Sequence, residues 1–301
     1  MVKRTLSGLA LAAAAGLAWG LVERRWFVVR HQTIPALAPS AGASVLRVLH
    51  LSDLHLTPGD RRLRRFVQRS LRSGPDLAVV TGDILGHPDA VDDAVALLSN
   101  VVAGRQGVAV LGSNDRFGPT VHNPLRYLRG PSGAPTGARL DTDRLVVGLK
   151  EAGWHVLCNE RVTLETASGN IDVVGLDDPH IGAASPAEVD WTAPDPPVPL
   201  RLGVVHSPYV GILNHFADAG FNITLAGHTH GGQVRVPGFG ALVDNCDLPL
   251  RMARGLSHFR NGMWLHVSAG LGTSPFAPVR FACRPELSVL DLVPPRTAPG
   301  L

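Results

Sequence analysis

Seven residues of the chain are of types that bind divalent metal ions, and each lies just after a short apolar run. They combine carboxylates, one amide and four imidazoles: Asp53, His55, Asp83, Asn114, His206, His228 and His230. A mixed oxygen and nitrogen ligand set suits borderline divalent ions such as Mn, Fe or Zn and does not suit calcium. The sequence therefore predicts a metal centre that could activate water for hydrolysis.

A centre with two neighbouring ions needs a carboxylate that bridges them, and Asp83 is the candidate. It follows Gly82, which allows the backbone to turn tightly. The short side chain then places both carboxylate oxygens near the end of the preceding apolar run. Each of the remaining six residues would then bind one of the two ions on either side of this bridge.

The apolar runs before these residues are short and rich in β-branched residues, and helical sequence follows several of them. Such alternation predicts sheets with helices packed on their outer faces. In open α/β sheets the carboxyl ends of the strands meet at one crevice, so residues distant in sequence can converge there. The five predicted strands are Val45 to Leu51, Leu77 to Thr81, Val108 to Leu111, Leu202 to Val205 and Ile223 to Ala226.

Between the first two predicted strands, Leu63, Phe66, Val67 and Leu71 recur at helical spacing, with arginines on or near the other face. A solvated basic face is the favoured interpretation, and contact with anionic lipid is the alternative. The stretch from Phe117 to Arg139 lacks periodicity, and we expect it to be a loop over the crevice that shapes the substrate site.

The N-terminus carries an uncharged stretch from Thr5 to Val22, after Lys3 and Arg4. We interpret residues 1–30 as a membrane anchor or signal segment, with an uncleaved anchor favoured over a cleaved signal or a buried helix. Residues 31–44 read as a linker, 45–293 as the catalytic domain and 294–301 as a C-terminal tail. The expected location is at a membrane, held by a single N-terminal helix.

Composition excludes several other classes of protein. Hydrophobic residues make up 45% of the 301 residues and charged residues 18%, which is typical of a globular chain with a sizeable core. The net charge of +3 favours anionic partners. The three cysteines, Cys158, Cys246 and Cys283, are too widely spaced to indicate a zinc knuckle or a disulfide framework.

The ordered blocks that contain the seven residues resemble those of the calcineurin-like metallophosphoesterases. The later segments are similar to a bacterial branch of phosphodiesterases that are often associated with membrane or wall. The blocks are Asp53-Leu54-His55, Gly82-Asp83, Gly112-Ser113-Asn114-Asp115, His206 and Gly227-His228-Thr229-His230, followed by Gly231-Gly232-Gln233-Val234, Gly270 to Ser274, Val279-Arg280-Phe281 and Arg284-Pro285-Glu286-Leu287.

This resemblance implies an α/β fold in which a two-sheet β-sandwich is flanked by helices. It also implies two divalent ions, one held by Asp53, His55, Asp83 and His230 and the other by Asp83, Asn114, His206 and His228. The residues assigned to catalysis are Asp53, Asp83, Asn114 and His228. The implied activity is hydrolysis of a small-molecule or lipid-linked phosphate ester, with phosphodiesters favoured, by a water or hydroxide that bridges the ions.

One block departs from the family pattern, which is Gly-Asn-His followed by Asp or Glu. Here Ser113 stands in the place of the Asn ligand and Asn114 in the place of the His that assists the leaving group. We expect a small backbone adjustment that lets Asn114 bind metal, because a neutral Ser is a poor ligand. Asp115 is expected to orient a ligand or neighbouring backbone by hydrogen bonds.

The missing His leaves two consequences open. The proton for the leaving group must come from water or another residue, or the substrate must have a good leaving group. Alternatively, the chain is a membrane-tethered protein that binds a metal or ligand and has weak or lost hydrolase activity. Nucleic acid is not an expected partner, because the basic stretch lacks interleaved aromatic residues. The sequence Asp177-Asp178-Pro179-His180 either borders the site or forms a turn.

Overall fold

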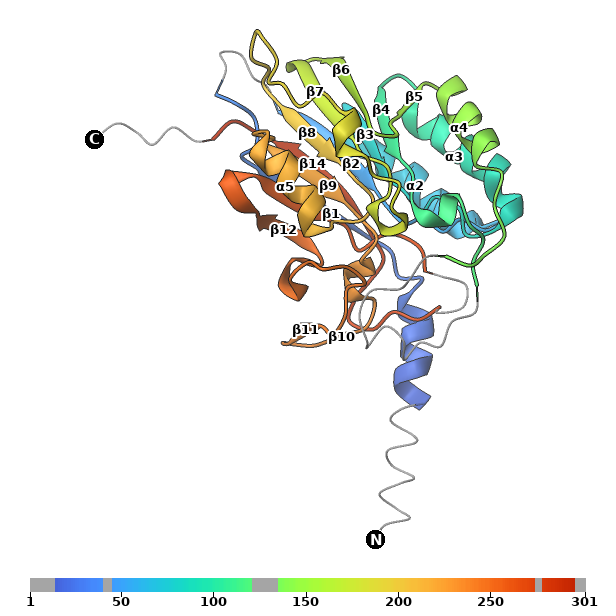
Figure 1. Ribbon diagram of the computed structural model, residues 1–301. Helices are drawn as coiled ribbons and strands as arrows, with labels where there is room; N and C mark the ends of the chain where they lie inside the picture. Colours follow the sequence, from blue (N-terminus) through green and yellow to red (C-terminus); the bar gives the residue numbers. More distant parts are fainter. Residues whose placement is uncertain (1–13, 40–44, 121–134, 274–277, 296–301) are drawn as a thin grey trace.

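The computed structural model describes residues 14–39, 45–120, 135–273 and 278–295, in which two six-stranded sheets pack face to face (Figure 1). The first sheet has the order β1-β14-β2-β3-β4-β5. Its strands are β1 (Val28–Ile34), β2 (Leu46–Leu51), β3 (Leu77–Thr81), β4 (Gln106–Val110), β5 (Trp154–Val156) and β14 (Glu286–Leu292). The predicted two-sheet α/β architecture is thus confirmed.

The second sheet has the order β12-β13-β9-β8-β7-β6. Its strands are β6 (Glu160–Thr166), β7 (Gly169–Gly175), β8 (Arg201–Val204), β9 (Ile223–Ala226), β12 (Gly255–His258) and β13 (Trp264–Val267). A separate two-stranded hairpin consists of β10 (Arg235–Val236) and β11 (Gly240–Ala241). The five predicted strands correspond to β2, β3, β4, β8 and β9, with ends within two residues of those expected.

Alternation along the strands gives each sheet two apolar faces. In β2, Leu46 and Val48 enter the core between the sheets, and Leu49 and Leu51 belong to the core on the outer face of the first sheet. Three helices cover that outer face and one covers the second sheet. They are α2 (Arg61–Ser70), α3 (Val91–Val102), α4 (Thr142–Glu151) and, on the second sheet, α5 (Val210–Asp218).

Helix α2 confirms the predicted helical spacing after the first strand. Its N-terminus is capped by Asp60, whose side chain accepts a hydrogen bond from the Leu63 amide. Leu63 and Val67 are buried against the sheet, as their spacing requires.

Parallel pairing is the feature of this fold that places the site. Strands β2, β3 and β4 run parallel to one another in the first sheet, and β7, β8 and β9 do so in the second. Their carboxyl ends lie at the same edge of the sandwich, so the turns that follow them face one another.

The chain enters this fold earlier than the predicted domain boundary at residue 45. Residues 28–34, which the sequence assigned to the end of the N-terminal segment and the start of the linker, form β1 and pair in parallel with β14. Just before it, the Glu23 side chain is buried and accepts hydrogen bonds from the amides of Ala282 (3.0 Å) and Cys283 (2.7 Å) and from the Trp19 indole (2.8 Å). The contacts of Glu23 with Ala282 and Cys283 join residues more than 250 positions apart.

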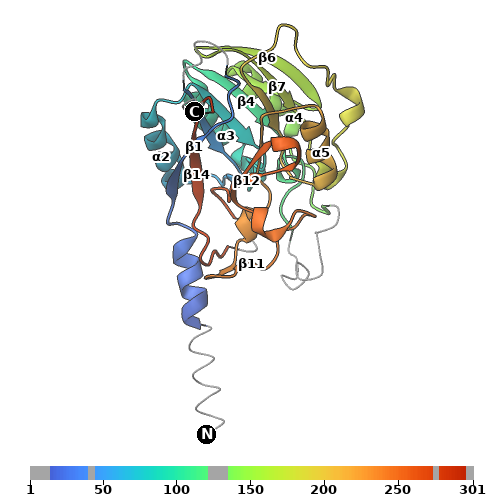
Figure 2. The same cartoon turned by 90° about the vertical axis from the view of Figure 1, so that its left-hand side faces the viewer.

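The predicted membrane segment, Thr5 to Val22, lies partly outside the described residues. In the part that the structure describes, residues 14–23 form a helix that extends away from the sandwich (Figure 2). Among the described residues, no helix is both long and apolar enough to span a bilayer. Most of the predicted crevice loop, residues 121–134, also lies outside the described residues.

We expect Glu23→Ala to destabilise the protein by roughly 2 kcal/mol, because the buried amide of Cys283 and the part-buried amide of Ala282 would lose their acceptor. Urea unfolding followed by circular dichroism measures the change. Glu151→Ala is the matched control, since Glu151 is exposed at the end of α4, and it should change stability by less than about 0.5 kcal/mol. If the two changes lowered stability equally, the hydrogen bonds from Ala282 and Cys283 to Glu23 would not stabilise the fold.

Candidate metal centre

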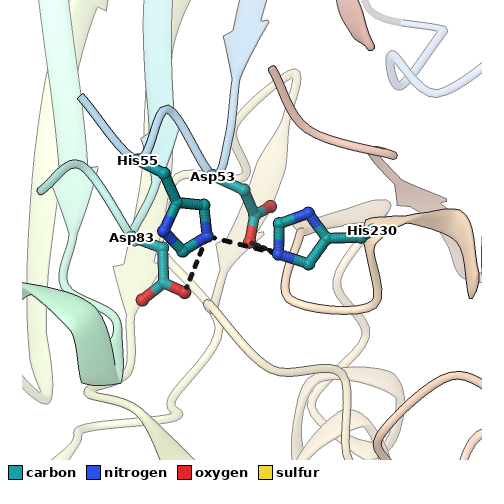
Figure 3. A group of neighbouring side chains, drawn as sticks. All are labelled: Asp53, His55, Asp83 and His230. Atoms are coloured by element: carbon teal, nitrogen blue, oxygen red, sulfur yellow. Dashed lines mark hydrogen bonds and ion pairs between the residues drawn. The ribbon is translucent and has the colours of Figure 1, made fainter. Parts of the chain in front are cut away.

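Four of the predicted residues form a tight group at the shared edge of the two sheets. Asp53 and His55 follow β2, Asp83 follows β3 and His230 follows β9. Each offers one ligand atom, and these atoms all lie within 4.8 Å of one another. The imidazoles of His55 and His230 and the two carboxylates point toward a common space (Figure 3).

The turns that carry these side chains have an uncommon backbone conformation. Asp53, His55, Asp83, His228 and His230 all have positive φ, between 42° and 67°. Few residues other than glycine adopt this conformation, and such strain persists where the surrounding structure enforces it and is concentrated at functional sites. Here it turns the chain sharply after each strand and aims the side chains back over the sheet edge.

Two glycines allow the carboxylates to approach this closely. A methyl group on Gly112 would lie 2.2 Å from Asp83 Oδ1, and one on Gly270 would lie 2.6 Å from Asp53 Cβ. Gly270 also has a φ of +69°, which disfavours any side chain there. The positions of both carboxylates therefore depend on the absence of a side chain next to them.

The nitrogen and oxygen atoms of the four-residue group lie at distances that suit a shared cation. His55 Nε2 lies 3.2 Å from His230 Nε2 and 3.5 Å from Asp83 Oδ2, and His230 Nε2 lies 3.7 Å from Asp53 Oδ1. Burial is the main cause that lowers the pKa of both histidines, which keeps them in the neutral form that binds metal. Burial also raises the pKa of Asp53 to about 6, and a nearby cation would offset that penalty. These residues fit a divalent metal ion.

His206 and Asn114 also contact Asp83. His206 Nε2 is 3.5 Å from Asp83 Oδ1, and its Nδ1 is 2.6 Å from the Thr81 carbonyl oxygen. The backbone amide of Asn114 donates to Asp83 Oδ1 (2.9 Å) and its side-chain amide donates to Oδ2 (2.7 Å). Burial opposes ionisation of Asp83, but the neighbouring His206 outweighs it and the pKa of Asp83 lies well below its usual range.

His228 is held close to these groups by its backbone. Its amide donates to both oxygens of Asp53 at 3.1 Å, and its Nε2 lies 3.1 Å from the Asn245 carbonyl oxygen. The centre of its ring is 5.2 Å from that of His206 and 4.6 Å from that of His180. The structure therefore brings all seven predicted residues to one edge of the sandwich. The ligand atoms of four of them lie within 4.8 Å of one another.

Asp115 orients the backbone around Asp83, as predicted. Its carboxylate accepts hydrogen bonds from the amides of Ile84 (2.7 Å), Leu85 (2.9 Å) and Gly112 (2.9 Å). Burial is the main cause that raises the pKa of Asp115 to about 7. These bonds join the turn after β3 to the turn after β4.

Two neighbours of the site received no definite role from the sequence. Arg280 is completely buried, and its Nη2 contacts His230 Nδ1 (3.2 Å) and the carbonyl oxygen of Gly272 (2.6 Å). His180, from the Asp-Asp-Pro-His sequence, borders the site through its ring contact with His228. The only sequence signal for Arg280 is its membership of a block in the family resemblance, and nothing in its spacing relates it to His230.

The turns after β2, β3, β4 and β9 all lie within a segment that matches a known family. The sequence model of the calcineurin-like phosphoesterases matches residues 46–232, which contain all seven predicted residues. The chain belongs to the calcineurin-like phosphoesterase family. This membership confirms the predicted assignment as a metal-dependent phosphoric ester hydrolase.

Three curated relatives match most of the chain. The phosphodiesterase YaeI of Escherichia coli is 28% identical, with 97% of this chain and 98% of its own length covered. The uncharacterized metallophosphoesterase YkuE of Bacillus subtilis is 25% identical, with 95% and 93% covered. The UDP-2,3-diacylglucosamine pyrophosphatase LpxG of Chlamydia trachomatis is 24% identical, with 81% and 83% covered.

We expect Gly112→Ala to reduce phosphoesterase activity at least tenfold and to lower the metal content, because the added methyl group would displace Asp83. Metal analysis and hydrolysis of bis(p-nitrophenyl) phosphate measure the two effects. Gly211→Ala is the matched control: this glycine lies in α5 with nothing within 4 Å of its Cβ position, so activity should be unchanged. A Gly112→Ala enzyme with normal metal content and activity would show that Asp83 need not lie at its present position.

Proposed function

We propose that this chain is a phosphodiesterase that works with two divalent ions bridged by Asp83. The observation that carries the proposal is the environment of the two Asp83 oxygens. Oδ2 faces His55 at 3.5 Å and Oδ1 faces His206 at 3.5 Å, so each oxygen has a different imidazole beside it. A carboxylate placed between two sets of neutral or basic ligands is suited to bridging two cations.

The remaining ligands divide on the two sides of this bridge. The ligand atoms of Asp53, His55, Asp83 and His230 lie within 4.8 Å of one another, and these four residues would hold one ion. Asn114, His206 and His228 would hold the second ion together with Asp83. The ligand types support Mn, Fe or Zn.

Divalent ions bound there would lower the pKa of a bound water and offset negative charge on the phosphoryl oxygens. The protein's own groups hold the site in shape for this chemistry. Asp115 holds the two turns beside Asp83, and the His228 amide fixes the Asp53 carboxylate. Because the usual family His is replaced, we propose that substrates with good leaving groups react fastest and that water supplies the proton for the others.

We further propose a small-molecule or lipid-linked phosphate ester as substrate and attachment to a membrane through the N-terminus. The name of YaeI supports a phosphodiester, and that of LpxG supports a pyrophosphate substrate with acyl chains. The described part of the N-terminal helix supports attachment, because Leu17 and Val22 are 58% and 59% exposed there.

We expect Asp83→Asn to lose nearly all activity and the tight binding of both ions, because a neutral amide cannot bridge two cations as a carboxylate does. The enzyme is stripped of metal, resupplied with Mn, Zn or Fe, and assayed for bound metal and for hydrolysis of mono- and diester substrates. Asp89→Asn is the control, since Asp89 lies six residues later and its side chain is 82% exposed. If Asp83→Asn retained two ions per chain and normal turnover, Asp83 would not be the bridge.

The departure at Ser113 and Asn114 gives a second test. We expect Asn114→Ala to weaken one metal site and to reduce the rate at least tenfold, because its side chain reaches Asp83. Ser113→Ala should have a much smaller effect. Metal titrations of both variants distinguish the readings: loss of metal in Ser113→Ala with normal binding in Asn114→Ala would support Ser113 as the ligand.

A further inference from the structure

Exposed apolar side chains gather at one end of the molecule. Of the twelve large hydrophobic side chains that are exposed among the described residues, five lie in residues 17–26, four in residues 234–242 around the β10–β11 hairpin, and one is Leu250. We call these ten side chains the apolar face: Leu17, Trp19, Leu21, Val22, Trp26, Val234, Val236, Phe239, Leu242 and Leu250. Phe239, at the tip of the hairpin, is 75% exposed.

The segments that make up this face are joined to one another through residues 280–283. The Arg235 amide donates to the Phe281 carbonyl oxygen (2.9 Å), and the Arg280 amide donates to the Gly20 carbonyl oxygen (3.1 Å). Figures 1 and 2 both place the β10–β11 hairpin beside the N-terminal helix, at the end where that helix leaves the sandwich. The apolar face is therefore one surface formed by segments distant in sequence.

The charges on the same segments have one sign at the surface. Residues 14–30, 234–242 and 250–251 contain the five arginines Arg24, Arg25, Arg30, Arg235 and Arg251, of which Arg30 is ion-paired with the buried Glu286 (3.3 Å). Their single acidic residue, Glu23, is buried and accepts hydrogen bonds from the protein. A hollow of about 570 Å³ between the hairpin and residues 250–251 is lined by Arg235 and Arg251 together with Val236, Phe239 and Leu250.

From this pattern we propose that the β10–β11 hairpin is a second membrane contact, which docks on the surface of an anionic lipid bilayer beside the N-terminal helix. Aromatic and aliphatic side chains enter the headgroup region, and the arginines pair with lipid phosphates. Charge complementarity favours anionic lipid over a second copy of the chain, whose matching face would carry the same arginines. Trp19 and Trp26 are of the residue type that lies at the bilayer interface.

Docking by the hairpin would also orient the active site. The hairpin begins at Arg235, shortly after His230, and the Arg235 side chain donates to the Gly231 carbonyl oxygen (2.7 Å). An enzyme held by both the helix and the hairpin presents the edge with the metal ligands close to the lipid surface. This step extends the proposed attachment through the N-terminus, and it does not depend on the substrate.

Vesicle binding by the full-length protein tests the proposal. The vesicles are either pure phosphatidylcholine or phosphatidylcholine with 30% phosphatidylglycerol, and binding is measured by flotation. We expect Phe239→Ser together with Val236→Ser to lower the partition coefficient at least tenfold on the anionic vesicles. Arg235→Gln together with Arg251→Gln should remove most of the preference for anionic over neutral vesicles.

Val147→Ser is the matched control, because Val147 is 54% exposed but lies on α4, outside the apolar face. It should bind vesicles like the unaltered protein. Melting temperatures show that each variant is folded, and Phe239→Ser alone replaces the double change if that variant melts early. Unchanged binding by the hairpin variants would restrict membrane contact to the N-terminal segment and overturn the proposal. A dimer in solution that Phe239→Ser dissociates, with vesicle binding unchanged, would assign the surface to protein association and overturn it too.

Discussion

The structure of the site depends on keeping two buried carboxylates, Asp53 and Asp83, close together. Burial disfavours the charged form of each, and the two negative charges repel, so the arrangement is costly without positive neighbours. Imidazoles surround the pair, and His206 is the neighbour whose pKa is raised well above its ordinary value because the carboxylates outweigh the effect of burial. Divalent ions bound beside the two carboxylates would add to this compensation.

Regular strands and the sharp turns after them hold the two carboxylates in these positions. Parallel strands from both sheets end at one edge, and left-handed residues directly after them reverse the chain. Glycines leave room beside the carboxylates, and Asp115 ties neighbouring turns together through backbone amides. A further chain of contacts runs from the N-terminus to the site: Glu23 holds residues 282–283, and Arg280 in the same segment reaches His230. The described part of the N-terminal helix is thereby joined to the segment that contacts the site.

Sequence reasoning identified the strands that end in the site, because their β-branched runs and polar ends are local signals. It did not identify β1, whose residues Arg30, His31 and Gln32 break the apolar pattern expected of a strand. That strand forms because its backbone pairs with β14, which lies more than 250 residues later and leaves no trace in the local sequence. The contact between Arg280 and His230 was missed for the same reason, since only tertiary packing brings them together.

The altered block places Asn114 against Asp83 in this structure. Gly112 is extended and held by Asp115, and residues 113–115 then form a single tight 3₁₀ turn. This turn directs the amide and the side chain of Asn114 to the two oxygens of Asp83, whereas the described contacts give Ser113 no such bond. Asn114 thus contacts both oxygens of Asp83, although the ungapped comparison assigns the ligand position to Ser113. In the proposed metal centre, this contact with Asp83 favours Asn114 over Ser113 as the ligand.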